Sequence, residues 1–194
     1  MKSQIIDFMS ETKTKDVYSQ LIQKVSARDF SDNLHGFVQM MMDLYEDTTG
    51  LDRSIHGKYF EYVVGESLAL SGIKNMYYQA TVNHVPLAMF DWFLYDEIYP
   101  VSISCKTKAR ERWKQAAYEG LALKQVYVGA TNYLVTLEPT ANIGHKKINA
   151  PRSIDHFIVA TQPEYTKAIK RISERQYSRA ELLPPLKSGT FVRI

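Results

Sequence analysis

Apolar residues recur at a helical spacing in the first third of the chain and at the spacing of strands after it. Residues 3 to 48 show the helical pattern, as in LHGFVQMMMDLY. A second helical pattern runs from about Ile55 to Leu70, and Ser54 stands where the N-cap of that helix is expected. The first third of the chain is therefore predicted to be helical.

Aromatic and β-branched residues dominate the next part of the chain, which predicts strands. The runs at residues 88 to 95 and 99 to 105 are separated by a turn at Asp96 and Glu97, so we expect them to pair as a hairpin. The remaining predicted elements are a strand at 76 to 82, a helix from Lys108 to about Leu123, strands at 125 to 130, 133 to 138 and 156 to 161, a helix from Pro163 to Gln176, and an irregular tail at 182 to 189.

The order of these elements predicts the fold class. Helices come first, then three strands, a helix, further strands and a last helix. This order indicates a mixed α/β fold, in which a central mixed β-sheet is flanked by helices and an N-terminal helical extension is added. We expect residues 1–50 to be the helical segment and residues 51–194 to be the α/β domain, together forming one compact unit.

The composition excludes several classes of protein. The 194 residues are 45% hydrophobic and 23% charged, which suits a folded domain with a core. Cys105 is the one cysteine, so the chain builds neither a disulfide framework nor a cysteine zinc cluster. The five histidines have no metal-binding spacing. No apolar run approaches the roughly 18 residues of a membrane span, and the N-terminus lacks a signal-peptide core, so a reducing, cytosolic setting is expected.

Positive charge is unevenly distributed along the chain. The formal net charge is only +3, but residues 106 to 114 hold five cations against a single acid, Glu111. This asymmetry fits either a surface for a polyanion or a solvated helix face. The five cations are Lys106, Lys108, Arg110, Arg112 and Lys114.

Asp91 and Lys106 are the candidate functional pair. Asp91 lies in a strand that is otherwise apolar or aromatic, where a carboxylate is costly to bury without a partner. Lys106 ends the neighbouring strand, and the short turn between them lets both side chains reach the same end of the sheet. Strand alternation places Ser102, Ser104 and Lys106 on one face. The sequence therefore predicts a polar face with an aspartate and a lysine at its end.

A divalent metal is the natural ligand for such a face. Magnesium usually takes one or two carboxylates together with water and phosphate oxygens, and a nearby lysine can orient or polarise the attacking water. Glu111 and Glu119 on the following helix are both candidates for the second carboxylate. At about 100° per residue, Glu119 falls beside the packed stripe of that helix and Glu111 falls towards solvent, so we favour Glu119.

These residues resemble a known nuclease motif. Asp91, twelve intervening residues and then Ser104-x-Lys106 are similar to the core of the PD-(D/E)xK nucleases, which include many restriction endonucleases. The predicted element order also looks like that core, over about residues 55 to 135. The usual motif has an acid two residues before the lysine, where this chain has Ser104. A subgroup of restriction enzymes has S-x-K instead and takes its acid from the next helix; twelve residues likewise separate Lys106 from Glu119.

The resemblance implies a restriction-endonuclease-like fold and Mg²⁺-dependent hydrolysis of DNA phosphodiesters. It assigns Asp91 as a metal ligand and Lys106 as the lysine that orients or polarises the water. Glu119 becomes the relocated acid and second metal ligand, and Ser104 belongs to the catalytic motif by its position.

Further residues follow from the same resemblance. The family commonly uses a glutamate on the helix before the first strand, which is expected at Glu61, with Glu66 as the alternative. Cations beside the site are expected to contact phosphates and so to position the duplex. These cations are Lys108, Arg110, Arg112 and Lys114.

The expected function is a type II restriction enzyme that cuts a specific sequence in double-stranded DNA. A homodimer is expected because two-fold symmetry is the simplest way to cut both strands with one site per chain. Such an enzyme would be cytoplasmic, encoded by a bacterium, an archaeon or a phage, with no membrane partner. The alternatives are a repair or recombination nuclease, such as a junction resolvase, and a catalytically inert DNA-binding protein of the same fold, which Ser104 favours. Two roles are possible for Met40 to Met42: a wedge between base pairs, or a contact in the core or at a dimer interface.

Overall fold

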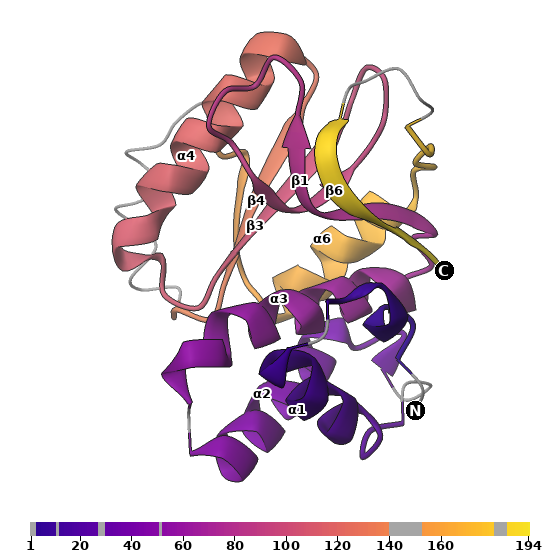
Figure 1. Cartoon of the computed structure of the whole chain (residues 1–194), viewed down its shortest axis with the longest axis vertical. Coiled ribbons are helices and arrows are strands. Elements are labelled where there is room, and N and C mark those ends of the chain that lie inside the picture. Colours follow the sequence, from indigo (N-terminus) through magenta and orange to yellow (C-terminus); the bar gives the residue numbers. More distant parts are fainter. Residues whose placement is uncertain (1–2, 11, 27–29, 51, 140–152, 181–185) are drawn as a thin grey trace. The chain divides into compact units, whose positions relative to one another are not determined.

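The computed structural model describes residues 3–10, 12–26, 30–50, 52–139, 153–180 and 186–194. Within these ranges, the side chains of Arg110, Glu111 and Leu186 lie outside the description. The chain divides into two compact units (Figure 1). A helical unit comprises residues 1–73, 160–175 and 194, and a sheet unit comprises residues 74–159 and 176–193. The boundary near residue 50 that the sequence suggests stays a prediction.

The helical unit is built around α3, whose side chains are buried along most of its length. It packs against α1, α2 and α6 (Figure 1). None of the helices in the described part of the chain is long and apolar enough to cross a membrane. The elements of this unit are the short 3₁₀ helix η1 (Ile6–Phe8), α1 (Lys13–Ile22), α2 (Leu34–Thr49), α3 (Arg53–Leu70) and α6 (Pro163–Ser173).

Two local features of the helical unit bear on the sequence predictions. The N-cap of α3 is Asp52, whose carboxylate accepts the backbone N–H of Ser54 at 3.0 Å, so the prediction that Ser54 caps the helix was wrong. An aspartate accepts this bond as well as a serine does. Met41 and Met42 are buried in α2, whereas Met40 is 41% exposed. The two buried methionines therefore belong to the core of this unit.

The sheet unit holds a mixed six-stranded sheet in the order β5-β4-β3-β2-β1-β6. The pairs β2–β3, β1–β2 and β1–β6 are antiparallel, and β3–β4 and β4–β5 are parallel. The α/β class, the mixed sheet and the N-terminal helices that the sequence predicts are confirmed. The elements are β1 (Asn75–Val82), β2 (Phe90–Leu94), β3 (Val101–Lys106), α4 (Ala109–Val126), β4 (Thr131–Thr136), β5 (His156–Val159) and β6 (Leu186–Arg193).

Two predicted elements of the sheet unit were wrong. The strand expected at residues 125–130 does not form, because α4 continues to Val126 and a turn leads directly into β4. The tail expected to be irregular contains β6, which pairs with β1 along the edge of the sheet. Gly189 helps to explain this pairing, since its φ of +146° and its close approach to Ala80 suit glycine alone.

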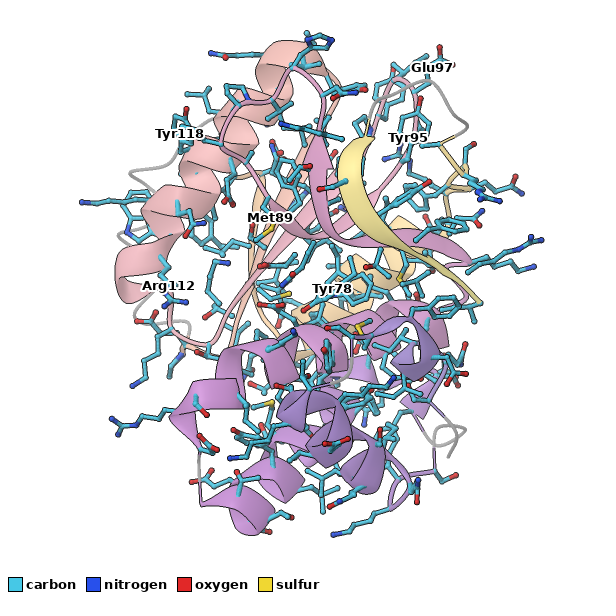
Figure 2. All side chains as sticks on the ribbon, viewed as in Figure 1. Tyr78, Met89, Tyr95, Glu97, Arg112 and Tyr118 are labelled. Carbon is cyan, nitrogen blue, oxygen red and sulfur yellow. The ribbon has the colours of Figure 1, made fainter. Side chains whose placement is uncertain are left out.

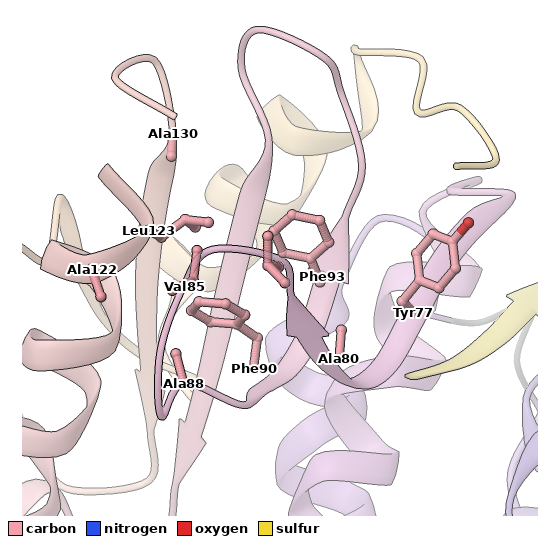
Figure 3. Packing of buried hydrophobic residues seen from close by; sticks show 10 residues of the cluster. Tyr77, Ala80, Val85, Ala88, Phe90, Phe93, Ala122, Leu123 and Ala130 are labelled. Atoms are coloured by element: carbon pink, nitrogen blue, oxygen red, sulfur yellow. The ribbon is translucent and has the colours of Figure 1, made fainter. Parts of the chain in front are cut away.

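α4 packs on the face of β3 and β4 through two groups of buried apolar residues. Near its start, Ala109 and Ala116 pack against Leu134 of β4. Near its end, Ala122 and Leu123 join a larger cluster with Phe90 and Phe93 of β2 (Figure 3). The helix is thus anchored on the sheet at both ends, which fixes the side chains between them.

Candidate active site

The structure brings Asp91 and Lys106 together at one end of the sheet. The antiparallel register of β2 and β3 pairs Trp92 with Ile103, and continuing it by one residue sets Asp91 opposite Ser104. Side chains two residues apart in a strand share a face, so Asp91, Ser104 and Lys106 lie on the same side. Lys106 Nζ donates to Asp91 Oδ2 at 2.9 Å, and the backbone N–H of Cys105 donates to the same oxygen at 2.7 Å.

This ion pair is largely removed from water, with 9% of the Asp91 side chain and 11% of the Lys106 side chain exposed. Burial lowers the pKa of Lys106, but the charge and the hydrogen bond of Asp91 raise it by more, so the net pKa lies above its ordinary value. Lys106 is therefore an ammonium at neutral pH. It can donate hydrogen bonds and stabilise negative charge.

Glu119 lies on α4, the helix that covers this face of the sheet, and is 2% exposed. Gln115, one turn earlier, donates to its Oε1 at 2.8 Å. Among the described residues, its buried Oε2 has no hydrogen-bond partner. Burial raises the pKa of this carboxyl above its ordinary value, which the amide of Gln115 and the charge of Lys106 partly offset. Glu119 is thus electrostatically coupled to the Asp91–Lys106 pair.

A buried polar network fixes the part of α4 that carries Glu119. The side chain of Asn132 in β4 donates to the carbonyl oxygen of Gly120 at 3.2 Å and accepts from Ser102 Oγ at 2.5 Å. Gly120 allows this close approach, because a Cβ there would lie 2.1 Å from the carbonyl oxygen of Ser153. The residue after Glu119 is therefore held directly against the sheet.

Glu138 is a buried acid that the sequence reasoning missed. Its Oε2 accepts the backbone N–H of Ala109 at 2.7 Å, at the first residue of α4. Lys108, the N-cap residue of this described helix, makes no side-chain capping bond, so the carboxylate of Glu138 takes that place and complements the helix dipole. The parallel register pairs Thr136 of β4 with Lys106 of β3. Glu138 comes two residues after Thr136, and this position at the end of a predicted strand could have identified it in the sequence.

The two carboxylates at this site fit a hard divalent cation. The described part of the chain contains no group of three or more His, Cys, Asp or Glu side chains that would bind a metal by themselves. Magnesium, however, takes only one or two carboxylates and completes its shell with water and substrate oxygens. Asp91 makes no hydrogen bond through Oδ1 to any described residue, and Oε2 of Glu119 is equally available. Asp91 and Glu119 are therefore the residues that would bind the ion.

The other predicted site residues lie in different places. Ser104 is buried on the Asp91 face and supplies a hydroxyl where the usual motif has a carboxylate. Glu61 and Glu66 lie on α3 in the helical unit, the former half-buried and the latter fully buried. The side chains of Arg110 and Glu111 lie outside the described residues. Lys108, Arg112 and Lys114 are exposed at the start of α4, where Figure 2 shows Arg112 projecting outward.

The sequence matches no known family model and no curated protein. The fold is similar to that of the restriction endonuclease PspGI in its complex with substrate DNA, with a TM-score of 0.57. The match covers 88% of this chain and 84% of that chain at 16% sequence identity. At this identity the likeness concerns the fold, so the chain has a restriction-endonuclease-like fold.

Proposed function

We propose that this chain is a magnesium-dependent DNA endonuclease, and specifically a type II restriction enzyme that cuts duplex DNA at a defined sequence. The observation that carries the proposal is the cluster of Asp91, Lys106 and Glu119. A buried aspartate–lysine pair faces a buried glutamate with an unpartnered oxygen among the described residues, on the sheet of a restriction-endonuclease-like fold. The cluster combines two carboxylates that can bind a divalent metal ion with one ammonium group that can stabilise negative charge. Metal-dependent hydrolysis of a phosphodiester uses both kinds of group.

Each residue of the cluster has a distinct role in this proposal. Magnesium, when bound, lowers the pKa of water and stabilises the charge that develops on the phosphate. Asp91 is held in place by the backbone N–H of Cys105, so its Oδ1 keeps a fixed direction for the ion. Glu119 presents Oε2 from α4, and the bond from Gln115 fixes its rotamer.

Lys106 has an electrostatic role. Its raised pKa keeps the ammonium charged, so it orients the attacking water and offsets the charge of the phosphate by donating hydrogen bonds.

The cations at the start of α4 support duplex DNA as the substrate. Lys108, Arg112 and Lys114 are exposed beside the site, where they are available for phosphate contacts that position the duplex. The solved structure with the similar fold is a complex with DNA. A homodimer remains part of the proposal, since two chains related by a two-fold axis would place one cluster on each strand.

Two other functions are compatible with the fold. A junction resolvase would use the same cluster on DNA of a particular shape, without a defined sequence. A catalytically inert DNA-binding protein would use the cations at the start of α4 to bind DNA, and the cluster of Asp91, Lys106 and Glu119 would have no catalytic role. Oε2 of Glu119 argues against the inert alternative, because a protein without a metal site has no reason to bury a carboxylate oxygen that lacks a partner among the described residues.

Plasmid digestion tests the proposal. The parent chain with Mg²⁺ should give discrete bands, whereas Asp91→Ala and Lys106→Ala should bind DNA without cleaving it. Sequencing the cut ends would then give the recognition site. A smear, or cleavage restricted to branched DNA, would support the other nucleases, and no cleavage with any divalent metal would refute the enzyme.

A further inference from the structure

A groove of about 840 Å³ lies between the segment that joins β1 to β2 and the start of β6. It lies wholly within the sheet unit, and nothing in the cluster of Asp91, Lys106 and Glu119 requires it. Its lining combines apolar, hydroxyl, amide and cationic groups. The residues that line it include Thr81, His84, Leu87, Met89, Lys187 and Ser188.

The segment between β1 and β2 has a fixed conformation. It consists of two consecutive turns, and the backbone N–H of Val85 donates to the carbonyl oxygen of Val82 at 3.2 Å. Val85 and Ala88 are buried in the same apolar cluster as Phe90 and Leu123 (Figure 3). Across the groove, Thr81 and Ser188 join their hydroxyls at 2.7 Å. The groove is therefore formed by a rigid scaffold.

Leu87 is exposed to solvent and has an unfavourable backbone conformation. Its φ is +57°, a left-handed conformation that disfavours residues with a branched side chain, and it follows Pro86 in a turn position that usually takes glycine or asparagine. Its side chain is 92% exposed, so burial offers no compensation. Such a residue is poorly explained by folding and well explained by a contact made with a ligand.

The segment that lines the groove leads along the chain into β2, the strand that holds Asp91. Met89 lines the groove, is 48% exposed and comes directly before Phe90, the first residue of β2. Asp91 follows two residues later. Four residues of extended chain span at most about 14 Å, so Leu87 lies within about four base-pair steps of a phosphate bound at Asp91, at about 3.4 Å per step.

The charge of the groove suits a nucleic-acid strand. Lys187 is exposed at its edge, and none of the described residues that line the groove is acidic. A cation can contact a phosphate, and a neighbouring exposed apolar side chain such as leucine can pack against a base.

We propose that this groove binds the substrate DNA strand beside the cut phosphate, with Lys187 contacting a phosphate and Leu87 packing against a base or sugar. The inference rests on the proposed endonuclease function and extends it to a substrate-positioning surface. Because the surface acts through binding, its variants change DNA affinity whether or not the chain cleaves.

Fluorescence anisotropy with a labelled duplex, measured with Ca²⁺ over a range of salt concentrations, tests the surface. Lys187→Ala should weaken binding about fivefold to tenfold and lower the salt slope by about 1, the value of one phosphate contact. Leu87→Asn should weaken binding about tenfold without changing the salt slope, because it removes an uncharged apolar contact. Leu87→Asn should also raise the melting temperature by about 2–4 °C, since asparagine tolerates the left-handed conformation better.

Matched controls make the outcome specific. Val128→Ala removes an apolar side chain that is 88% exposed on the turn after α4, and Lys167→Ala removes an exposed cation of α6. Both should bind DNA like the parent chain, apart from the small salt effect of one lost charge. Parent-like affinity and salt slope in both groove variants would overturn the inference. If the parent chain never cleaves DNA but the groove variants bind DNA more weakly than the parent, the groove is supported and the endonuclease function is refuted. If the groove variants cleave DNA at the parent rate, the endonuclease function is supported and the role of the groove is refuted.

Discussion

Glu66 in the helical unit and Glu119 in the sheet unit are both buried, but they differ in how many hydrogen bonds their carboxylates accept. Glu66 in the helical unit accepts hydrogen bonds on both oxygens, from Ser3 Oγ at 2.5 Å, from the backbone N–H of Gln4 at 3.0 Å and from Tyr18 at 3.2 Å. Glu119 in the sheet unit accepts one bond, from Gln115, and leaves Oε2 without a partner among the described residues. Burial raises the pKa of both carboxyls.

The difference separates an acid whose oxygens are both used by the fold from one that leaves an oxygen available for a ligand. Three donors converge on Glu66 and tie the N-terminal segment to α3, so its carboxylate is fully used by the fold. Glu119 is buried with an unused acceptor beside another carboxylate and a lysine, which is unfavourable for folding alone. Burial and raised pKa are common to both residues; the number of partners distinguishes them.

The largest expected effect is on catalysis. Glu119→Gln should lower the rate of Mg²⁺-dependent DNA cleavage by at least about 10²-fold, the cost of removing one group that stabilises developing charge. An amide is a poor magnesium ligand compared with a carboxylate. Glu66→Gln, the same chemical change in the other unit, should retain parent activity below its melting temperature. Cleavage rates on supercoiled plasmid measure both, and equal losses in the two variants would remove the distinction.

The same two substitutions should change stability in opposite directions. Glu66→Gln places an amide NH₂ against converging donors, so the free energy of unfolding should fall by about 1–3 kcal/mol. Glu119→Gln removes a buried carboxylate that lacks a partner among the described residues, so the free energy of unfolding at pH 7.5 should rise by about 0.5–2 kcal/mol. Urea denaturation followed by circular dichroism measures both values. A loss of stability in Glu119→Gln would mean that Oε2 has a structural partner.

A pair of glycines tests whether the placement of Glu119 depends on close packing. A Cβ at Gly120 would lie 2.1 Å from the Ser153 carbonyl oxygen, so Gly120→Ala should cost about 1–3 kcal/mol and shift Glu119 enough to reduce cleavage. A Cβ at Gly57 in α3 would point into open space, with no neighbouring side chain within 4 Å, so Gly57→Ala should stabilise by about 0.5–1 kcal/mol. Thermal melts separate the two, and a tolerated Gly120→Ala with full activity would contradict the packing argument.

The pH dependence of stability gives the smallest effect. Burial raises the folded pKa of Glu119 above the ordinary value of about 4.3 for the unfolded chain, so the folded state binds the proton more tightly. This contribution to stability is complete below about pH 4 and is lost as the pH rises through the folded pKa. The gain in stability of Glu119→Gln over the parent should therefore grow from about pH 4 upward. Denaturation series across pH 4–8 measure this difference, and a constant difference would contradict the raised pKa.

Local patterns were enough to place the ion pair. The short turn between β2 and β3 and the alternation of strand faces brought Asp91 and Lys106 together, and the helical projection placed Glu119 on the sheet side of α4. Each of these relations depends on residues close in sequence or on one regular element, whose geometry is fixed by the backbone. Whether the three residues act on DNA stays a prediction.

Long-range relations were not predictable. The bond between Asn132 and Gly120 and the capping of α4 by Glu138 depend on how β4 pairs, which no local pattern contains. The run at 125–130 is rich in β-formers, but α4 continues to Val126 and the rest of the run forms a turn. In the sequence, β6 was hidden by the two prolines that precede it and by its own Gly189, a glycine that an edge strand tolerates.

Plasmid cleavage by three chains under identical Mg²⁺ conditions tests the central claim most directly. The parent and Glu66→Gln should cut supercoiled plasmid at similar rates, and Glu119→Gln should leave it intact while remaining at least as stable as the parent. Parent-rate cleavage by Glu119→Gln, or no cleavage by the parent with any divalent metal, would contradict the assignment of Asp91, Lys106 and Glu119 as a nuclease site.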